Sequence, residues 1–349
     1  GLGDVYKRQI LFLFFSLAGF SQISKVHYIP PLTSNKSIAG GSSIPLDQYM
    51  YLSTPSENNV TVTVTPLNGD SPTTYNDLSN SNPRTYEIGN SYSGGFVASQ
   101  LFVDHETTGG NTALNAGFVV EADCPIYVSI RYNAGAQAGA LVSKGDASLG
   151  TNFRAGMMTN GTAQTANAHY TANSFFSVMA TQDNTTVAID LPNAIIGQTT
   201  LSNYNYQGPF TKVLQKHESM ILSLDFLNTN ANNEGARNSL NGALIRSVDE
   251  NGTEDGTKPL VVNVGSASGS FTSTGSGHDH GIDQIVGLDR VGHEYIFVRG
   301  NGQNLNDGGQ LETPLIIATK DNTSLYINGS NTAAATIDAG DFWLATTDY

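Results

Sequence analysis

The 349-residue sequence predicts an all-β protein made of tandem antiparallel β-repeat units. Apolar and polar residues alternate with a period of two in many short segments, such as NVTVTVTP (59–66), where the Val side chains share one face. Asn-Gly, Gly-Gly and Asp-Asn pairs between these segments are typical of tight turns. Similar strand patterns occur at 125–132, 185–192, 219–226, 259–266, 294–300, 314–319 and 324–329.

An internal repeat organises these strands. The segment MATQDNTTVAIDLPN (179–193) matches IATKDNTSLYINGSN (317–331), and LSTPSENNVTVTVTP (52–66) is a weaker copy. The copies lie roughly 130–140 residues apart, whereas one propeller blade has about 40–50 residues. We therefore expect sandwich-like units, with a β-propeller as the alternative. The expected divisions are a first unit over 22–145, a second over 146–285 and the start of a third, truncated unit over 286–349.

The shared A-T-x-D-N-T string predicts a structural hairpin rather than an active site. Its Asp can accept backbone N–H bonds within the turn, its Asn tolerates the left-handed backbone conformation, and its Thr begins the return strand. The motif residues are Thr181, Asp183, Asn184 and Thr185 in one copy and Thr319, Asp321, Asn322 and Thr323 in the other.

The two ends of the sequence have their own interpretation. The string DVYKRQ (4–9) matches the translation of a transposon end used to tag DNA for sequencing, so we expect residues 1–9 to be a sequencing-adapter artefact. The apolar run over 10–21 has the length of the apolar core of a signal peptide and is too short to span a bilayer. We expect it to be a truncated signal peptide, and the chain to be a fragment of a longer exported protein.

Charge and composition exclude some partners. The formal net charge is −14, and only 16 residues are Lys or Arg, so no basic surface is expected for nucleic acid or an anionic membrane. Beyond the signal-like run, no apolar stretch reaches membrane-spanning length. The single cysteine, Cys124, cannot form an internal disulfide and is expected to be a small buried residue at the entrance of a strand.

Two acidic or histidine-rich segments are candidates for metal binding, although we expect no metal and no cofactor. In GSGHDHGID (275–283), an extended backbone would place the imidazoles of an H-x-H pair on one side; the candidate ligands are His278, His280 and Asp283. In DENGTEDGT (249–257), clustered carboxylates would suit calcium, but Gly252 lies too early for an EF-hand, and a solvated hairpin tip is the simpler interpretation. The acidic candidates are Asp249, Glu250, Glu254 and Asp255.

No catalytic residue is predicted. The segment VDHETTGGN (103–111) contains Asp104 and Glu106, but no nucleophile elbow, zinc-protease motif or phosphate loop accompanies them. Aromatic residues cluster near Asn in HYTANSFF (169–176) and NYNYQGPF (203–210), where they would either stack on sugar rings or simply pack within strands.

Three segments in order carry a family resemblance: KPLVVNVGS (258–266), GIDQIVGLDRVGHEYIFVRG (281–300) and ETPLIIATKDNTSLYINGS (312–330). Together they resemble the IgGFc-binding protein N-terminal domain family, whose bacterial members look like large secreted Bacteroidota proteins with gliding-motility or type IX secretion sorting domains. Gly287 stands where the family pattern has Pro. The resemblance implies an extracellular β module; it transfers neither catalytic residues nor immunoglobulin binding.

These observations predict a non-enzymatic module for adhesion or ligand binding, located outside the cell or on the outer cell surface. The expected partner is an extracellular protein or glycan, with no nucleic acid and no membrane insertion, and repetition would raise avidity through multivalent contact. One alternative is a carbohydrate-active hydrolase or carbohydrate-binding accessory domain, with Asp104, Glu106 or Asp283 as its carboxylates. Another is a structural spacer within a large surface protein.

Overall fold

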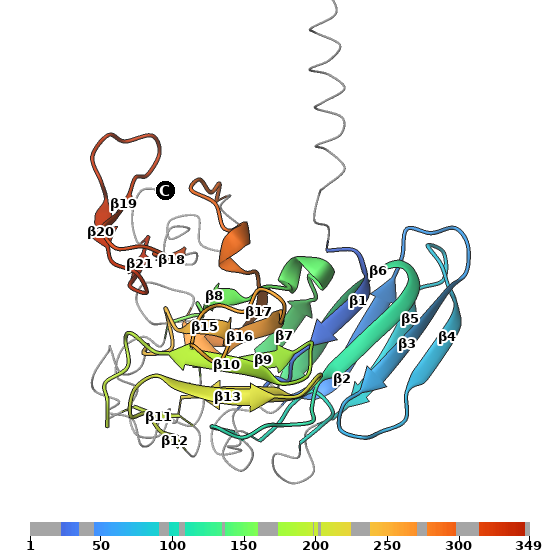
Figure 1. Ribbon diagram of the computed structural model, residues 1–349. Coiled ribbons are helices and arrows are strands. Elements are labelled where there is room, and N and C mark those ends of the chain that lie inside the picture. The colour runs from blue at the N-terminus through green and yellow to red at the C-terminus, as the bar shows by residue number, and fades with distance from the viewer. Residues whose placement is uncertain are drawn as a thin grey trace, which may run out of the picture.

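The computed structural model contains antiparallel β-sheets throughout its described residues (Figure 1). Besides strands, the described part of the chain has only two short 3-10 helices, Gly145–Ser148 and Leu288–Arg290. The all-β prediction is therefore confirmed. The structure describes residues 22–34, 45–90, 98–104, 109–134, 137–159, 174–197, 199–201, 204–224, 238–270, 278–297 and 314–345.

Unit 1 is a set of seven strands that wrap around one apolar core. The long strand β6 joins two halves: its first part pairs with β1 and β3, and its second part pairs with β2 and β7, with β4 and β5 at the outer edges. The result is one nearly closed, barrel-like sheet. The strands are β1 (Ser24–Ile29), β2 (Leu46–Ser53), β3 (Val60–Pro66), β4 (Thr73–Leu78), β5 (Arg84–Gly89), β6 (Phe118–Ala134) and β7 (Gln137–Val142).

Unit 2 repeats this topology with separate sheets. The first sheet has the order β13-β10-β15-β8 and the second has the order β14-β9-β16-β17. A small hairpin of β11 (Thr200–Leu201) and β12 (Tyr204–Asn205) is additional. The main strands are β8 (Asn152–Arg154), β9 (Ser174–Ala180), β10 (Thr185–Asp190), β13 (Phe210–Leu214), β14 (Ser219–Ser223), β15 (Leu244–Val248), β16 (Leu260–Ser270) and β17 (His278–Ile285).

Strand by strand, the two units correspond. In unit 1 the first sheet is β4-β3-β6-β1 and the second is β5-β2-β6-β7, so β6 takes the places of both β15 and β16. The Thr that ends the second strand makes the same contact in each unit: Thr54 Oγ1 donates to Pro125 O at 3.0 Å, and Thr181 Oγ1 donates to Pro259 O at 2.6 Å. The strands of unit 2 are divided between two sheets, and the chain passes from one to the other several times, as from β8 to β9 to β10, which matches a sandwich and not the single-sheet blade of a propeller.

Four further strands form the described part of unit 3: β18 (Leu315–Ile317), β19 (Thr323–Leu325), β20 (Ala335–Ile337) and β21 (Phe342–Leu344). The strand β19 pairs with β20 as β3 pairs with β4, and β18 pairs with β21 as β2 pairs with β5. The same pairing rule therefore holds in all three units.

The D-N-T motif joins two sheets and does not close a hairpin, so the expected hairpin is wrong. Its flanking strands lie in different sheets, since β9 pairs with β14 and β16 while β10 pairs with β13 and β15. Val178 of β9 and Val187 of β10 are buried in the same apolar cluster, so the two sheets that contain these strands pack around one core and the motif crosses from one sheet to the other. In unit 3, β18 and β19 also belong to different sheets.

The backbone of this turn follows the sequence pattern. Asn184 and Asn322 have φ angles of 53° and 54°, in the left-handed region. The Thr at the start of the next strand donates back across the turn, from Thr185 Oγ1 to Gln182 O at 2.8 Å and from Thr323 Oγ1 to Lys320 O at 2.6 Å.

The Asp of the motif accepts a backbone hydrogen bond from a neighbouring turn rather than from its own turn. Asp183 Oδ1 accepts the backbone N–H of Lys216 at 3.1 Å, and Asp321 Oδ1 accepts that of Ala339 at 3.1 Å. In both units the bonded residue lies in the turn that precedes the fifth strand. The motif thus ties together two turns at one end of the sandwich.

Units 1 and 2 are joined by buried polar side chains. Gln284 of β17, which is fully buried, donates from Nε2 to Tyr28 O at 2.9 Å and accepts the Lys144 N–H at 2.7 Å. Asn263 of β16, also fully buried, donates to Pro30 O at 2.9 Å. These bonds satisfy amides of unit 2 with backbone groups of unit 1, and both amides lie in the segments that carry the family resemblance.

A buried histidine supports the same region from within unit 1. His27 Nε2 lies 3.0 Å from Ile126 O, which can only accept, so this nitrogen carries the proton of the neutral ring. Its Nδ1 lies 3.0 Å from the Ser143 hydroxyl oxygen. Burial lowers the pKa of His27. At the rim, Lys144 Nζ contacts both carboxylate oxygens of Asp283, at 2.8 and 2.9 Å.

The left-handed turn gives a first prediction. Replacing Asn184 by Ala should lower the free energy of unfolding by roughly 1 kcal/mol, because alanine lacks the short polar side chain that lets Asn adopt the left-handed backbone region and also loses the bond from Gln215 Nε2. Asn184→Gly should be nearly neutral, since glycine adopts positive φ freely. Urea denaturation of the two variants checks this, and equal stabilities would contradict it.

The interface gives a second prediction. Gln284→Ala should destabilise the chain by roughly 2–4 kcal/mol, because it removes a fully buried amide and its bonds to the Tyr28 carbonyl and the Lys144 N–H. The matched control is Gln207→Ala at an exposed position. Denaturation monitored by circular dichroism measures both variants. A Gln284→Ala midpoint equal to that of the control would contradict the assigned role.

Candidate functional site

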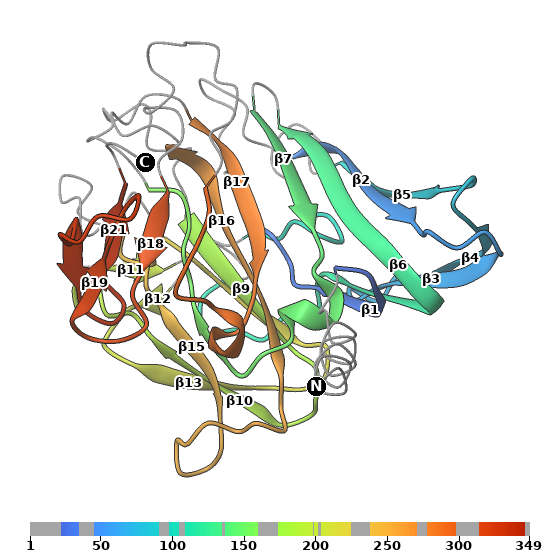
Figure 2. The ribbon, with the colours of Figure 1, turned by 90° about the horizontal axis from the view of Figure 1, so that it is seen from above.

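The outer face of the second sheet differs between units 1 and 2. In unit 2 this face packs against unit 1: Phe175, Met179 and Ile221 are fully buried, and Phe175 and Ile221 belong to the apolar cluster of unit 1. Figure 2 shows β7 of unit 1 lying beside β17 of unit 2. In unit 2 the outer face of the second sheet is therefore buried in the contact between units 1 and 2.

In unit 1 the corresponding face is open. Tyr51 and Tyr127 are 41% and 43% exposed, and Val142 is 43% exposed. Tyr49 and Arg131 lie on the same face by strand alternation. We call this surface the tyrosine face, defined by Tyr49, Tyr51, Tyr127, Arg131 and Val142.

The register arranges the tyrosines as a row across two strands. Tyr49 of β2 pairs with Arg131 of β6, and Ser53 of β2 pairs with Tyr127. Tyr51 lies between them, with its ring centroid 6.5 Å from that of Tyr49 and the ring planes at 52°. Tyrosine supplies large contact area at a small cost in side-chain entropy, and together with Arg it is enriched at the energetic centres of protein interfaces. The tyrosine face therefore has the composition of a binding surface.

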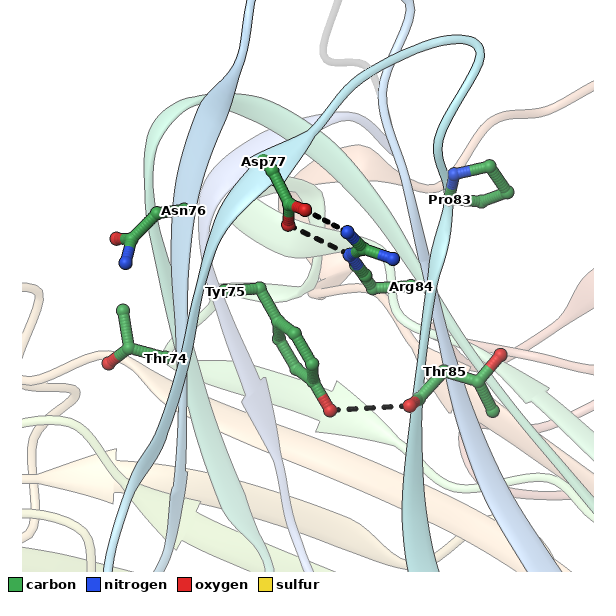
Figure 3. A pocket seen from close by; sticks show the side chains of 7 residues that line it. All are labelled: Thr74, Tyr75, Asn76, Asp77, Pro83, Arg84 and Thr85. Carbon is green, nitrogen blue, oxygen red and sulfur yellow. Dashed lines mark hydrogen bonds and ion pairs between the residues drawn. The ribbon is translucent and has the colours of Figure 1, made fainter.

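A concavity lies at the edge of unit 1, between β4 and β5 (Figure 3). It has a volume of about 760 Å³ and is lined by Thr74, Tyr75, Asn76, Asp77, Pro83, Arg84 and Thr85. The Tyr75 hydroxyl donates across it to Thr85 O at 3.2 Å, and Arg84 Nε donates to Asp77 Oδ1 at 2.9 Å. The Arg84 guanidinium lowers the pKa of Asp77.

The histidine-containing candidates do not converge. His280 is 7% exposed, and its Nδ1 lies 2.9 Å from the Tyr132 hydroxyl in the contact between units. Asp283 lies on the opposite face of β17 and pairs with Lys144. The side chain of His278 lies outside the described residues. Across the described ranges, no three His, Cys, Asp or Glu side chains gather as a metal site would require.

The acidic segment forms the loop between β15 and β16. Asp249 Oδ1 accepts the backbone N–H groups of Asn251 and Thr253, each at 2.9 Å. Glu254 accepts the Thr151 hydroxyl, and Asp255 Oδ1 accepts the Thr257 N–H at 3.0 Å. Glu250 is exposed. These carboxylates therefore stabilise turns and do not point to a common centre.

The carboxylate pair and the aromatic clusters proposed from the sequence do not form a site within the described residues either. Glu106 lies outside the described residues, so its relation to Asp104 is not described. Of the aromatic clusters, Phe175 and Phe176 are fully buried core residues, and Tyr206 is 2% exposed with its hydroxyl bonded to the Leu191 N–H. Within the described residues these aromatic rings therefore pack rather than present a sugar-binding surface.

Cys124 is exposed, which corrects the expectation that it is buried. It lies in the middle of β6, where the strand leaves the first sheet for the second and its side chains belong to neither core.

Comparison with known proteins identifies the family. The model of the IgGFc binding protein family matches residues 138–349, which is more than half of the chain. The chain therefore belongs to the IgGFc binding protein family. No curated protein and no solved structure matches the chain. In the described part of the chain, no helix is long and apolar enough to cross a membrane.

Sequence reasoning missed the tyrosine face. The segments LDQYMYLS (46–53) and PIYVSIRY (125–132) do carry Tyr residues at alternating positions. That alternation shows which residues share a face, but it does not show whether a neighbouring unit covers that face. The available signal is the overall composition of the outward positions, which include Phe, Met and Ile in unit 2 but Tyr, Thr and Arg in unit 1.

The buried histidine of the interface gives a pH prediction. Burial lowers the pKa of His280 from 6.5 to about 4, and the Asp279 charge opposes the shift only in part. Between these values the unfolded chain binds a proton that the folded chain does not, so stability should fall as the pH falls from 6.5 toward 4, by roughly 3 kcal/mol in total.

Urea denaturation between pH 7 and pH 4 tests this dependence. His280→Gln should reduce the loss of stability over that range, because the replacement does not titrate. The matched control is His293→Gln at an exposed position, which should keep the wild-type slope. Equal pH slopes in wild type and His280→Gln would contradict the prediction.

Proposed function

We propose that this chain is the binding part of an exported bacterial surface or secreted protein and that it holds a protein ligand on the tyrosine face without catalysis. The observation that carries the proposal is the contrast between the units. The same sheet face is buried in unit 2 and carries exposed Tyr51 and Tyr127 in unit 1. Family membership supports a protein ligand.

Export is part of the proposal. It is supported by the signal-like composition of residues 10–21 and by a surface rich in uncharged polar residues, with charged residues at only 13%. Because charged residues are few, the chain should also bind its ligand with little dependence on salt. We propose adhesion as the biological role, since a rigid β scaffold with one open face suits attachment.

The repeats serve this function differently from the sequence-based expectation. Unit 2 does not present the equivalent face, because unit 1 covers it. Units 1 and 2 therefore offer one copy of this surface, and repetition builds a stiff stack instead of multiplying the site. Avidity would then require several molecules side by side.

The hydrolase and spacer alternatives have less support. A glycosidase needs two carboxyl groups facing one cleft, whereas Asp283, one of the three candidate carboxylates, pairs with Lys144. A pure spacer would have no need of a row of exposed tyrosines. A glycan ligand stacked on these rings is a second candidate, favoured by the row geometry of Tyr49 and Tyr51.

Binding to arrays of purified extracellular proteins and of glycans tests the proposal. The double variant Tyr51→Ala/Tyr127→Ala should lose binding to its protein target by roughly 10- to 100-fold, as expected for removal of two central anchors. The control Tyr326→Ala changes another exposed tyrosine, in unit 3, and should bind like wild type.

The other results of this experiment are equally informative. Binding to glycans alone would replace the protein ligand by the glycan alternative. Equal binding by wild type and the double variant would remove the tyrosine face as the site. Turnover of a glycan, detected as released reducing ends, would overturn the non-catalytic assignment.

A further inference from the structure

In each sandwich the fourth strand forms an edge of the first sheet and the fifth strand forms an edge of the second. Among the described residues, no backbone pairing joins these two edge strands, so the sandwich has a side that is not closed by its own strands. This side lies between β13 and β14 in unit 2 and between β4 and β5 in unit 1. We call it the lateral cleft. The two lateral clefts have the same position in the topology but different contents, and this difference leads to an inference separate from the tyrosine face.

The lateral cleft of unit 2 is filled by an extended segment of unit 1, residues 110–114. Gly110 N–H donates to Ile221 O at 3.1 Å, and Leu114 exchanges two backbone bonds with Ser219, at 2.7 and 2.9 Å. On the other side of the cleft, Lys212 Nζ donates to Asn111 O at 3.1 Å. The segment thus adds an irregular strand to the free edge of β14 while also contacting β13.

The residues of this segment suit the place they fill. Its sequence, GNTAL, is uncharged. Leu114 packs against the apolar cluster of unit 1, and Ala113 packs against that of unit 2. Small and aliphatic residues on an extended backbone are therefore sufficient to close a lateral cleft of this fold.

In unit 1 the described residues that line the lateral cleft all come from β4, β5 and the turn before β5. Thr85 of β5 corresponds to Ile221 of β14: each pairs with the second strand of its unit and points away from the core of its own unit. The carbonyl of Thr85 receives the Tyr75 hydroxyl, where the carbonyl of Ile221 receives a backbone N–H (Figure 3).

We propose that the lateral cleft of unit 1 binds an extended, uncharged peptide segment of a partner protein by strand addition to β5. A backbone N–H of the peptide replaces the Tyr75 hydroxyl at Thr85 O, as Gly110 bonds Ile221 in unit 2. Because Asp77 and Arg84 neutralise each other, the cleft offers no unpaired charge, which favours an uncharged segment. Pro83 has no N–H, so the added strand cannot reproduce both of the bonds that Leu114 makes with Ser219.

A synthetic peptide with the sequence of residues 109–116, GGNTALNA, is the probe. Carrying a fluorescent label, it should bind the full chain saturably in an anisotropy titration. Because the equivalent cleft of unit 2 is already filled within the chain, this binding is expected at unit 1. Replacing the second Gly by N-methylglycine removes the donor and should weaken binding about tenfold. Tyr75→Phe removes the competing hydroxyl and should strengthen binding roughly threefold.

Hydrogen exchange locates the peptide independently of any variant: amides of residues 84–89 should gain protection when it is bound. Tyr326→Phe, which changes an exposed tyrosine in unit 3, should leave the affinity unchanged. The proposal is overturned by the absence of saturable binding up to about 2 mM peptide, by equal affinity of the N-methylated peptide, or by protection confined to other strands.

Discussion

The buried amide of Gln284 is the constraint on which the arrangement of the units depends. Its donors and acceptors are satisfied by Tyr28 O and the Lys144 N–H of the preceding unit, and Asn263 adds a bond to Pro30 O. A buried amide without partners is costly, so the bonds of both side chains constrain the relative orientation of the two sandwiches. That orientation decides which sheet faces are covered and which stay open.

Because of this orientation, the second sheet and the lateral cleft are covered in unit 2 and exposed in unit 1. The stacked unit 1 covers the second sheet of unit 2 and fills its lateral cleft with residues 110–114, while its own second sheet and cleft stay open. The residues have diverged accordingly: buried Phe175 and Met179 are suited to packing, and exposed Tyr51 and Tyr127 are suited to contact with a ligand. A duplicated fold thereby yields two candidate binding surfaces, both on unit 1.

Much of the local structure could be predicted from the sequence. Period-two alternation indicated the strands, and the D-N-T string indicated a turn with a left-handed Asn, as the φ values of Asn184 and Asn322 show. The same string could not distinguish a hairpin within one sheet from a turn that crosses between two sheets, because both use the same turn residues. Only the strand pairing distinguishes the two, since β9 and β10 join different sheets. Cys124 was misplaced for a related reason, since a bend within β6 leaves no mark in the alternation.

The sequence by itself determined the all-β class, the repeat and its period, and the family, because these depend on local propensity and on similarity along the chain. The tertiary structure alone decided which sheet each strand joins, that His280 and Asp283 lie apart, and that one tyrosine-bearing face remains uncovered. The physical reason is that a strand pattern defines two faces of a sheet without assigning either to solvent. That assignment comes from the neighbouring unit, whose position depends on buried hydrogen bonds between residues more than 200 positions apart, such as Tyr28 and Gln284.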